Sequence, residues 1–268
     1  MLQTHILIAM VLILAAVVIP VIYLKKTKQI SLLVFLLGGV GFYLSSQIFE
    51  NLLHRLVLQP QADGTIALMK NAPLLYVLYG IATAAIFEET ARYVIFRYLQ
   101  KKRPLTIGDS LAYGLGHGGI EALFIGISGL LSLFVLAQLV SQGNSPLLAK
   151  LPQATIYYVQ KLQAGQIYLL AFERILALAI QVFLTFWVWT AVKDKKLGYF
   201  LAALGFHALI DLAPALVQVG WLTQPILVEV IILVEFLALV FLTKKFLSIS
   251  IFTVSYTHLR AHETPEHL

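Results

Sequence analysis

Apolar runs of about 20 residues recur along this chain, and they constrain its fold more than any other feature. A helix of about 20 apolar residues spans the hydrocarbon core of a bilayer. The composition agrees, because 60% of the 268 residues are hydrophobic and 12% are charged, with a mean hydropathy of +0.88. A soluble domain carries roughly 25% charged residues. The sustained alternation of a membrane β-barrel is missing, so we predict an all-α, polytopic transmembrane helix bundle.

The apolar runs predict seven membrane spans. Their approximate bounds are 5–24, 30–53, 73–99, 109–140, 166–192, 197–219 and 224–242. The fourth run is too long for a simple span and is rich in glycine, so we expect it to be broken, tilted or re-entrant. The longest predicted loop is 141–165. The first run lacks a basic leader and a small-residue cleavage site, so we expect a retained helix rather than a signal peptide.

The basic residues between the runs predict the orientation. Eleven of them lie on one side: Lys25, Lys26, Lys28, Lys101, Lys102, Arg103, Lys193, Lys195, Lys196, Lys244 and Lys245. Four lie on the other side: Arg55, Lys70, Lys150 and Lys161. The positive-inside rule then predicts an N-terminus outside and a C-terminus in the cytoplasm. The net charge of +6 reflects these loops, so we expect a multi-pass protein of a bacterial plasma membrane and no nucleic-acid partner.

The end of the chain differs from the rest. Residues 1–253 are predicted to form one membrane-embedded domain, whereas 254–268 read VSYTHLRAHETPEHL, which is polar and rich in histidine. We predict that 254–268 is a non-native tail from a translated adapter sequence, with a cytoplasmic metal-binding tail as the alternative. The chain has no cysteine, which excludes disulfides, thiolate metal ligands and a cysteine nucleophile.

Several predicted spans contain ionisable or strongly polar residues. Such a residue costs roughly 3 kcal/mol at the centre of a bilayer, so it is a functional candidate by default. The third span carries Glu88, Glu89 and Arg92, the fourth His117 and Glu121, the fifth Gln181, and the sixth His207 and Asp211. Residues four apart share a helix face, so Glu88 can pair with Arg92. One arginine cannot neutralise two carboxylates, which leaves one glutamate to hold a proton or bind a cation.

These polar residues are predicted to lie at a similar depth. At 1.5 Å of rise per residue, Glu88, His117, Gln181 and His207 lie roughly 12–20 Å from the basic end of their spans. Each pair taken singly is also typical of a structural hydrogen bond or ion pair. The neighbouring Gly116, Gly118 and Gly119 are equally typical of close helix packing. The common depth on four spans favours one shared site.

The residue types suit the activation of water. A glutamate in a dry cavity can act as a general base near neutral pH. Histidines can hold the water, bind a metal or stabilise an oxyanion. The implied reaction is hydrolysis of a peptide bond within or next to the membrane.

Three motifs, in order and each in a predicted span, resemble known intramembrane proteases. FEETAR (87–92) resembles the EExxxR motif of the CPBP group, which includes the type II CAAX prenyl proteases, although only two residues separate Glu89 from Arg92. HALID (207–211) resembles that group's later histidine motif. GLGHGGIEA (114–122) and ERILA (173–177) more closely resemble the YhfC-type intramembrane metalloproteases. The resemblance covers roughly residues 5–250 and implies a peptidase whose partners are membrane lipids and a membrane-embedded peptide or protein substrate.

The resemblance also implies roles for the polar residues. Glu88 would be the water-activating base with Glu89 beside it, and His117 and His207 would complete the catalytic set. Support of the site or substrate would come from Arg92, Glu121, Gln181 and Asp211.

The resemblance leaves open whether the site binds a metal ion. His117, His207, Glu88 and Glu121 offer zinc-binding groups, but the sequence has no HExxH motif. Prenyl proteases of this kind are also discussed as metal-independent glutamate proteases. The sequence departs from the CPBP pattern where GLGH replaces FxxxH, and Gln181 occupies the place where some relatives carry a histidine. Zinc and a metal-free mechanism therefore both stay open.

Two other functions compete with this interpretation. GISG (126–129) matches the short motif of rhomboid-like serine proteases, with Ser128 as nucleophile and His207 as base, although Ser128 lies roughly 28 Å along the helix from Asp109. A proton- or ion-coupled transporter, or a membrane scaffold, would also use intramembrane charges, but no clear internal repeat is present. Glu173 and Arg174 are predicted to form an interfacial ion pair at the outer surface, with a substrate-gating role as the alternative. Substrate identity and oligomeric state stay open.

Overall fold

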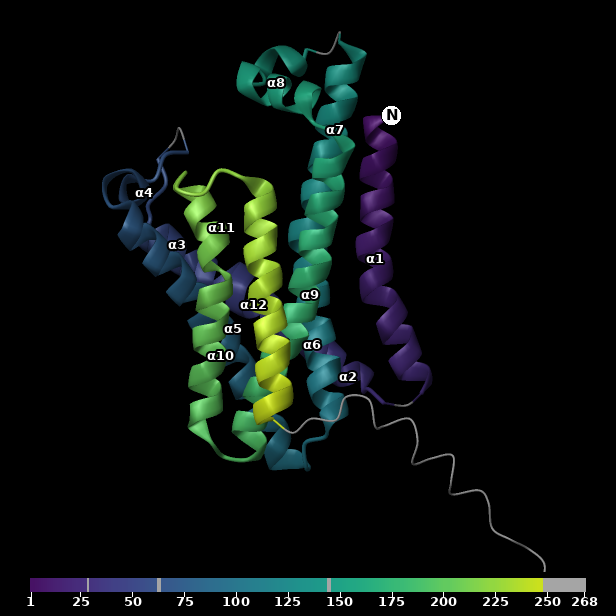
Figure 1. The fold of residues 1–268 in the computed structure, drawn as a ribbon, viewed down its shortest axis with the longest axis vertical. Helices are drawn as coiled ribbons and strands as arrows, with labels where there is room; N and C mark the ends of the chain where they lie inside the picture. Colours follow the sequence, from purple (N-terminus) through teal and green to yellow (C-terminus); the bar gives the residue numbers. More distant parts are fainter. Residues whose placement is uncertain (28, 62–63, 144–145, 248–268) are drawn as a thin grey trace, which may run out of the picture.

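The computed structural model describes residues 1–27, 29–61, 64–143 and 146–247, so the predicted tail at 254–268 lies outside the described residues. Figure 1 shows a bundle of long helices that run roughly along one axis. Within these described residues, seven helical runs are long and apolar enough to cross a membrane, which confirms the predicted number of spans and the all-α fold. Their bounds are Leu2–Lys26, Leu32–Val57, Pro73–Lys102, Ile107–Gln142, Ala164–Lys193, Leu197–Gln218 and Pro225–Phe246.

Four of the spans are single regular helices. These are α1 (Leu2–Lys26), α5 (Pro73–Lys102), α9 (Ala164–Lys193) and α12 (Pro225–Phe246). Proline stands in the first turn of α5 and of α12, where its fixed φ suits a helix start and its missing N–H costs nothing. The ends that carry lysine lie together at the lower end of the bundle in Figure 1, and we call this the basic end.

The other three spans change geometry along their length. The second is α2 (Leu32–Phe42), a π-helical segment η1 (Tyr43–Glu50) and α3 (Asn51–Val57). The fourth is α6 (Ile107–Glu121), a π-helical segment η2 (Ala122–Ile127) and α7 (Ser128–Gln142). The sixth is α10 (Leu197–Ile210) followed by α11 (Leu212–Gln218). The short elements outside the spans are α4 (Ala67–Asn71), a 3₁₀ turn (Leu148–Lys150) and α8 (Gln153–Lys161).

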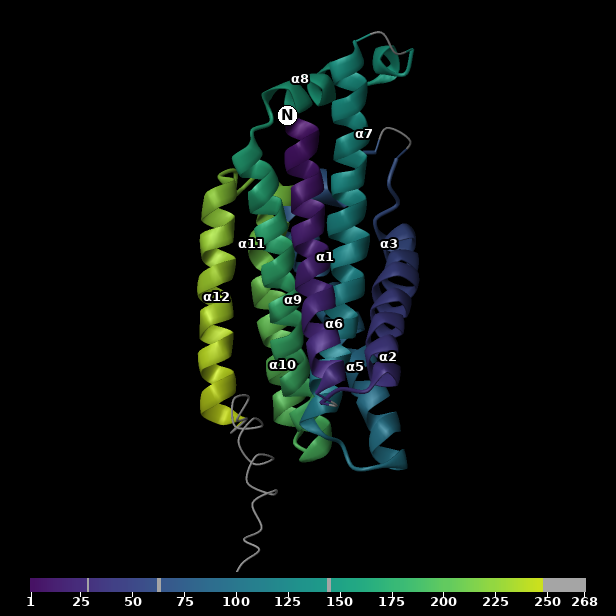
Figure 2. The same cartoon turned by 90° about the vertical axis from the view of Figure 1, so that its right-hand side faces the viewer.

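The fourth span corrects a prediction. It is one continuous helical run of 36 residues, so it is neither broken nor re-entrant. At 1.5 Å per residue it is about 54 Å long, which exceeds a hydrocarbon core of about 30 Å. Figures 1 and 2 show α7 reaching past the neighbouring helices to α8, which occupies part of the predicted loop at 141–165.

The glycines of α6 allow two neighbouring helices to approach closely. A Cβ atom on Gly116 would stand 1.9 Å from the backbone oxygen of Phe35 in α2. A Cβ atom on Gly118 would stand 2.9 Å from a side-chain carbon of Leu178 in α9. Small residues permit this kind of packing in membranes. Because α6 is held so closely on both sides, His117 between these glycines is fully buried.

A proline explains the interruption of the sixth span. Pro214 has no backbone N–H and therefore cannot bond to the carbonyl of Ile210, one turn earlier. The chain forms a turn at Asp211 before α11 begins. Breaks of this kind are tolerated in membranes where they line a polar cavity.

An ion pair closes the turn between α5 and α6 at the basic end. Arg103 donates two hydrogen bonds to Asp109, at 2.8 and 2.5 Å. Asp109 also completes a capping box with Thr106 at the start of α6. The hydrogen bonds to the Asp109 carboxylate raise the pKa of the Arg103 guanidinium, which is about 42% exposed.

Candidate functional site

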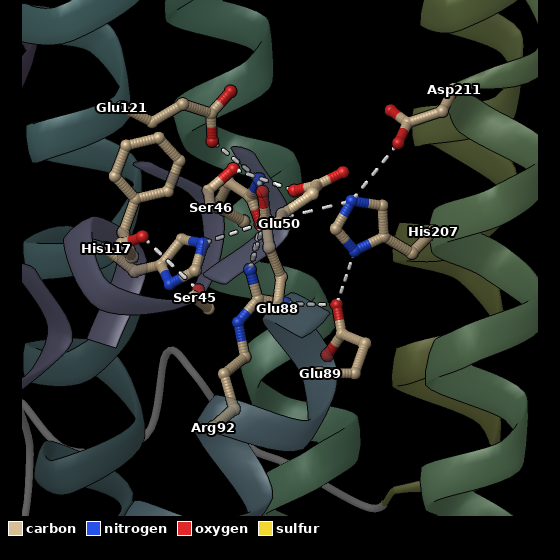
Figure 3. Close-up of polar contacts among 12 residues, drawn as sticks. Ser45, Ser46, Glu50, Glu88, Glu89, Arg92, His117, Glu121, His207 and Asp211 are labelled. Carbon is tan, nitrogen blue, oxygen red and sulfur yellow. Dashed lines mark hydrogen bonds and ion pairs between the residues drawn. The ribbon is translucent and has the colours of Figure 1, made fainter. Parts of the chain in front are cut away.

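The centre of the site is a contact between α5 and α6. The Nε2 atom of His117 lies 2.9 Å from a carboxylate oxygen of Glu88 (Figure 3). Both residues are buried among the helices. The glycine-mediated approach of α6 is what brings the imidazole within reach of α5.

Glu89 is held from two sides. The guanidinium of Arg92 lies 2.5 Å from its Oε1 atom, and the Nδ1 atom of His207 lies 2.6 Å from the same oxygen. The distance from Arg92 to Glu88 is longer, at 3.6 Å. The i,i+4 pairing predicted for Glu88 and Arg92 is therefore the weaker contact. Arg92 compensates mainly Glu89, and Glu88 is the carboxylate left facing the cavity.

Gln181 lies in α9 and connects three of the four helices that form the site, α5, α6 and α9 but not α10. Its amide oxygen accepts a hydrogen bond from Arg92, which fixes the orientation of the amide. The amide nitrogen then donates to Glu121 at 2.6 Å and to Glu88 at 3.3 Å. The amide therefore links the carboxylates of α5 and α6.

His207 lies between two helices. Its Nε2 atom is 3.3 Å from Asp211 and 3.8 Å from Glu88, while Nδ1 contacts Glu89. The turn at Asp211 carries that carboxylate to the imidazole one turn earlier (Figure 3). Both ring nitrogens can donate only when the ring is protonated, and both face carboxylate oxygens.

All eight residues singled out from the sequence belong to this one network. We call it the Glu88 cluster: Glu88, Glu89, Arg92, His117, Glu121, Gln181, His207 and Asp211. The predicted convergence of four spans is thus confirmed as geometry. The catalytic and supporting roles stay predictions.

The sequence analysis overlooked a second polar row, on η1 and α3. Ser46 donates to Glu50 at 3.1 Å, His54 lies 3.3 Å from Glu50, and the other nitrogen of His54 lies 3.0 Å from the hydroxyl of Tyr79. Ser46, Glu50 and His54 are spaced four apart, which is the signal that could have identified one polar face. Glu50 is only 6% exposed.

The contacts of Arg174 also differ from those that the sequence predicted. It pairs with Glu173 as expected, but its guanidinium also comes within 3.8 Å of Glu121 in the cluster. Its aliphatic carbons pack over Gly126, where a Cβ atom would stand 2.9 Å away. Arg174 is therefore not simply an interfacial residue.

A polar cavity of about 520 Å³ extends from the Glu88 cluster. It is lined by side chains of α2, η1, α3, α5, α6, η2, α9, α10 and α11. The lining residues include Phe42, Ser46, Glu50, His54, Leu58, Tyr76, Tyr79, Gly80, Ala84, Glu88, Glu121, Arg174, His207, Asp211, Ala215 and Gln218.

The serine alternative has no support in this geometry. Ser128 is exposed on the outside of α7 and donates its hydroxyl proton to the carbonyl of Phe124 in its own span. Ser128 is absent from the cavity lining. The described residues thus place Ser128 in no catalytic pair with His207.

Three residues of the cluster could hold a metal ion. One ligand atom each from Glu88, His117 and Glu121 lies within 4.8 Å of the others. One imidazole and two carboxylates are a donor set that zinc accepts, with a fourth position left for water. His207 was predicted as a further ligand but is outside this group, because its two nitrogens face Glu89 and Asp211. The donor chemistry therefore fits a metal at Glu88, His117 and Glu121.

The fold and the site define an integral, multi-pass membrane protein with a buried glutamate–histidine cluster. Residues 10–232 match the family described as YhfC intramembrane metalloprotease. The chain is also 34% identical over 218 residues to the "Uncharacterized membrane protein YhfC" of Bacillus subtilis (strain 168), which covers 79% of this chain and 83% of that protein. The chain belongs to the YhfC family. No solved structure matches it.

Proposed function

We propose that this protein is an intramembrane endopeptidase that hydrolyses a peptide bond in or near the bilayer. The observation that carries the proposal is the position of Glu88, which lines a polar cavity within the membrane bundle and is hydrogen-bonded to the buried His117 behind it. The family description supports the same activity. The resemblance to CPBP proteases, through FEETAR and the later histidines, is part of the proposal.

Glu88, His117 and Glu121 are the residues that would hold a metal in this proposal. A bound zinc ion would lower the pKa of a water molecule and polarise the carbonyl of the substrate. Gln181 holds the two carboxylates through its amide nitrogen. Arg92 and Arg174 limit the repulsion between the carboxylates of the site.

The chain's own residues account for the proton transfers. Glu88 accepts a proton from the water whose oxygen attacks the peptide carbonyl. His207 donates a proton to the leaving nitrogen as the C–N bond breaks. Glu89 and Asp211 orient the imidazole through Nδ1 and Nε2. The 3.8 Å contact between Glu88 and His207 returns the proton and resets the pair.

The orientation of the chain is also proposed here. Eleven lysines and arginines lie in the sequence segments assigned to one side of the membrane and four in those assigned to the other, so the basic end faces the cytoplasm and the N-terminus lies outside. The membrane would be a bacterial plasma membrane.

A cleavage assay with the purified, lipid-embedded protein tests the proposal. A membrane-embedded reporter peptide is incubated with the wild type and with Glu88→Gln, and products are identified by mass spectrometry. We expect products from the wild type alone, bound zinc in the purified protein, and loss of cleavage with a chelator. Zinc binding that is retained by His207→Ala and lost by His117→Ala would support the assigned ligands. No product from either form, together with ion flux that Glu88→Gln abolishes, would instead support the transporter.

A further inference from the structure

The cavity of about 520 Å³ extends from the Glu88 cluster away from the basic end. On α5 its lining residues are Tyr76, Tyr79, Gly80, Ala84 and Glu88, together with Ile81. They lie on the half of α5 that precedes Glu88, and the lysines of α5 stand at its opposite end. The α5 wall of the cavity therefore leads away from the basic end.

The two facing walls follow the same course. The second span contributes Phe42, Ser46, Glu50, His54 and Leu58, each four residues after the last. The sixth span contributes residues from His207 to Gln218, and Gln218 accepts a hydrogen bond from Tyr76 at 2.9 Å. Gln218 is exposed there and Tyr76 is half-buried. The cavity thus reaches the surface at the end of the bundle opposite the lysines.

The side of the cluster toward the basic end is closed by packed side chains. Arg92, Phe96 and Tyr113 are completely buried there. The ring of Phe96 packs on that of Tyr113 with centroids 5.1 Å apart. Water and substrate therefore have their route to Glu88 through the cavity, from the far end.

The lining of this route is acidic. Glu50, Glu88, Glu121 and Asp211 line it, and Arg174 is the one permanent cation among the described lining residues. Glu50 contacts only Ser46 and His54 of its own span, and among the described residues it has no lysine or arginine at ion-pair distance. A cleft lined by one sign of charge, with low-dielectric walls, concentrates ions of the opposite sign.

We propose that this cavity is the entry for the substrate, that it opens to the extracytoplasmic face, and that it selects peptide segments carrying a cationic side chain or a free amine. Its volume of about 520 Å³ is in the range of sites that enclose a ligand of a few residues. The inference rests on the proposed function, which makes the bound molecule a peptide substrate, and on the proposed orientation, which makes the open face extracytoplasmic.

Thiol labelling tests the direction without requiring any catalysis. The chain contains no cysteine, so a single introduced cysteine is the sole thiol. Ala84→Cys lines the cavity one turn from Glu88, whereas Ala82→Cys lies exposed on the outer surface of the same helix. A membrane-impermeant thiosulfonate added outside intact cells should label Ala84→Cys and should leave the lipid-facing Ala82→Cys unmodified.

A second introduced cysteine keeps the test valid if the first variant does not fold. Ala215→Cys lies on the opposite wall of the cavity and should be labelled from the same side as Ala84→Cys. Labelling of both cysteines only from the cytoplasmic side of inverted vesicles, or of neither from outside, would overturn the proposed entry.

The charge preference is measured by comparing two reagents of similar size. A trimethylammonium thiosulfonate should modify Ala84→Cys at least about tenfold faster than a sulfonate analogue, because the acidic lining concentrates cations. Glu50→Gln should lower this ratio about twofold or more. Glu229→Gln, which removes a carboxylate that lies in α12 and outside this cavity, should leave it unchanged. Equal rates for the two reagents would refute the preference.

The labelling result separates the two proposals. Outside labelling with cation preference but no peptide cleavage would reject the protease and retain the outward acidic entry. Cleavage with labelling only from the cytoplasm would retain the protease and reject the entry.

Discussion

The two halves of the bundle are built differently, although they share the same helices. In the half toward the basic end, α2, α6 and α9 meet through glycines, and aromatic residues such as Phe96 fill the core. In the other half, the same spans enclose a polar cavity of about 520 Å³. The change occurs at the level of Glu88.

Local changes in helix geometry coincide with that level. The π-helical segment η2 begins directly after Glu121, η1 ends at Glu50, and the sixth span turns at Asp211. π-Helical segments occur often at functional sites. The comparison indicates that irregular helices, rather than separate loops, create the space in which the polar residues work.

The largest effect is expected from Glu88→Gln. Loss of the proposed base should lower the rate of peptide cleavage about 10²- to 10⁴-fold, because the amide cannot accept the proton from water. The matched control is Glu229→Gln, which changes a buried glutamate of α12 outside the Glu88 cluster. Turnover of a membrane-embedded peptide measures both. Similar losses in the two variants would mean that the polar half has no special role.

Arg92→Ala should have the next largest effect, and on stability. Arg92 is completely buried between Glu89, Glu88 and Gln181, so its removal leaves uncompensated carboxylates. Breaking a buried pair in this way costs about 3–5 kcal/mol. Thermal unfolding in detergent should show a large fall for Arg92→Ala. Arg97→Ala, an exposed position on the same helix, should change little, and equal stability of both variants would contradict the assigned pairing.

Much of the fold was predictable because the membrane imposes a simple rule on the sequence. A run of apolar residues must form a helix in lipid, so seven runs gave seven spans. The prediction of a break or re-entry in the fourth span was wrong, because its glycines were read as breaks. In the structure Gly116 faces the backbone of Phe35, and helix periodicity alone does not reveal which neighbour a glycine meets.

The Glu88 cluster was predictable from depth, since charged residues are costly in lipid and therefore gather. Which side chains of the cluster pair with each other was not predictable from the sequence. Arg92 lies closer to Glu89 than to Glu88, because the position of His207 on another span decides which carboxylate turns inward. Glu50 was overlooked because it lies near the end of its run, and the reach of Arg174 to Glu121 depends on the space above Gly126.

Gly116→Ala tests the packed half directly. The added Cβ atom would stand 1.9 Å from the Phe35 carbonyl oxygen, so α2 and α6 must separate. Overpacking typically costs about 1–3 kcal/mol, and the shift should also weaken the contact between His117 and Glu88. Gly205→Ala on α10 has nothing within 4 Å of the new Cβ atom and serves as control. Unfolding temperature and cleavage rate should fall together for Gly116→Ala alone.

Asp211→Asn should affect the rate more than substrate binding. Asp211 acts through His207, at 3.3 Å, and loss of such an outer partner typically costs about 10- to 100-fold in activity. We expect the loss in kcat with KM little changed, because the side chain remains the same size in the cavity wall. A change confined to KM would assign Asp211 to substrate binding instead.

The smallest effect is expected at the far edge of the packed half, where Arg103 pairs with Asp109 between α5 and α6. Arg103→Gln should lower the free energy of unfolding by at most about 1 kcal/mol, because the arginine is partly solvated and such pairs are weak. Asp109 keeps its hydrogen bonds from the backbone N–H and hydroxyl of Thr106, at 2.7 and 3.0 Å, so the carboxylate is not left unpaired. The difference from wild type should shrink as salt is added, since salt screens exposed charges, whereas the Arg92→Ala difference should persist because Arg92 lies out of reach of solvent. Titration of both variants with salt in the unfolding assay therefore distinguishes the solvated end of the packed half from the interior at the Glu88 cluster, and a similar salt response in both would contradict that distinction.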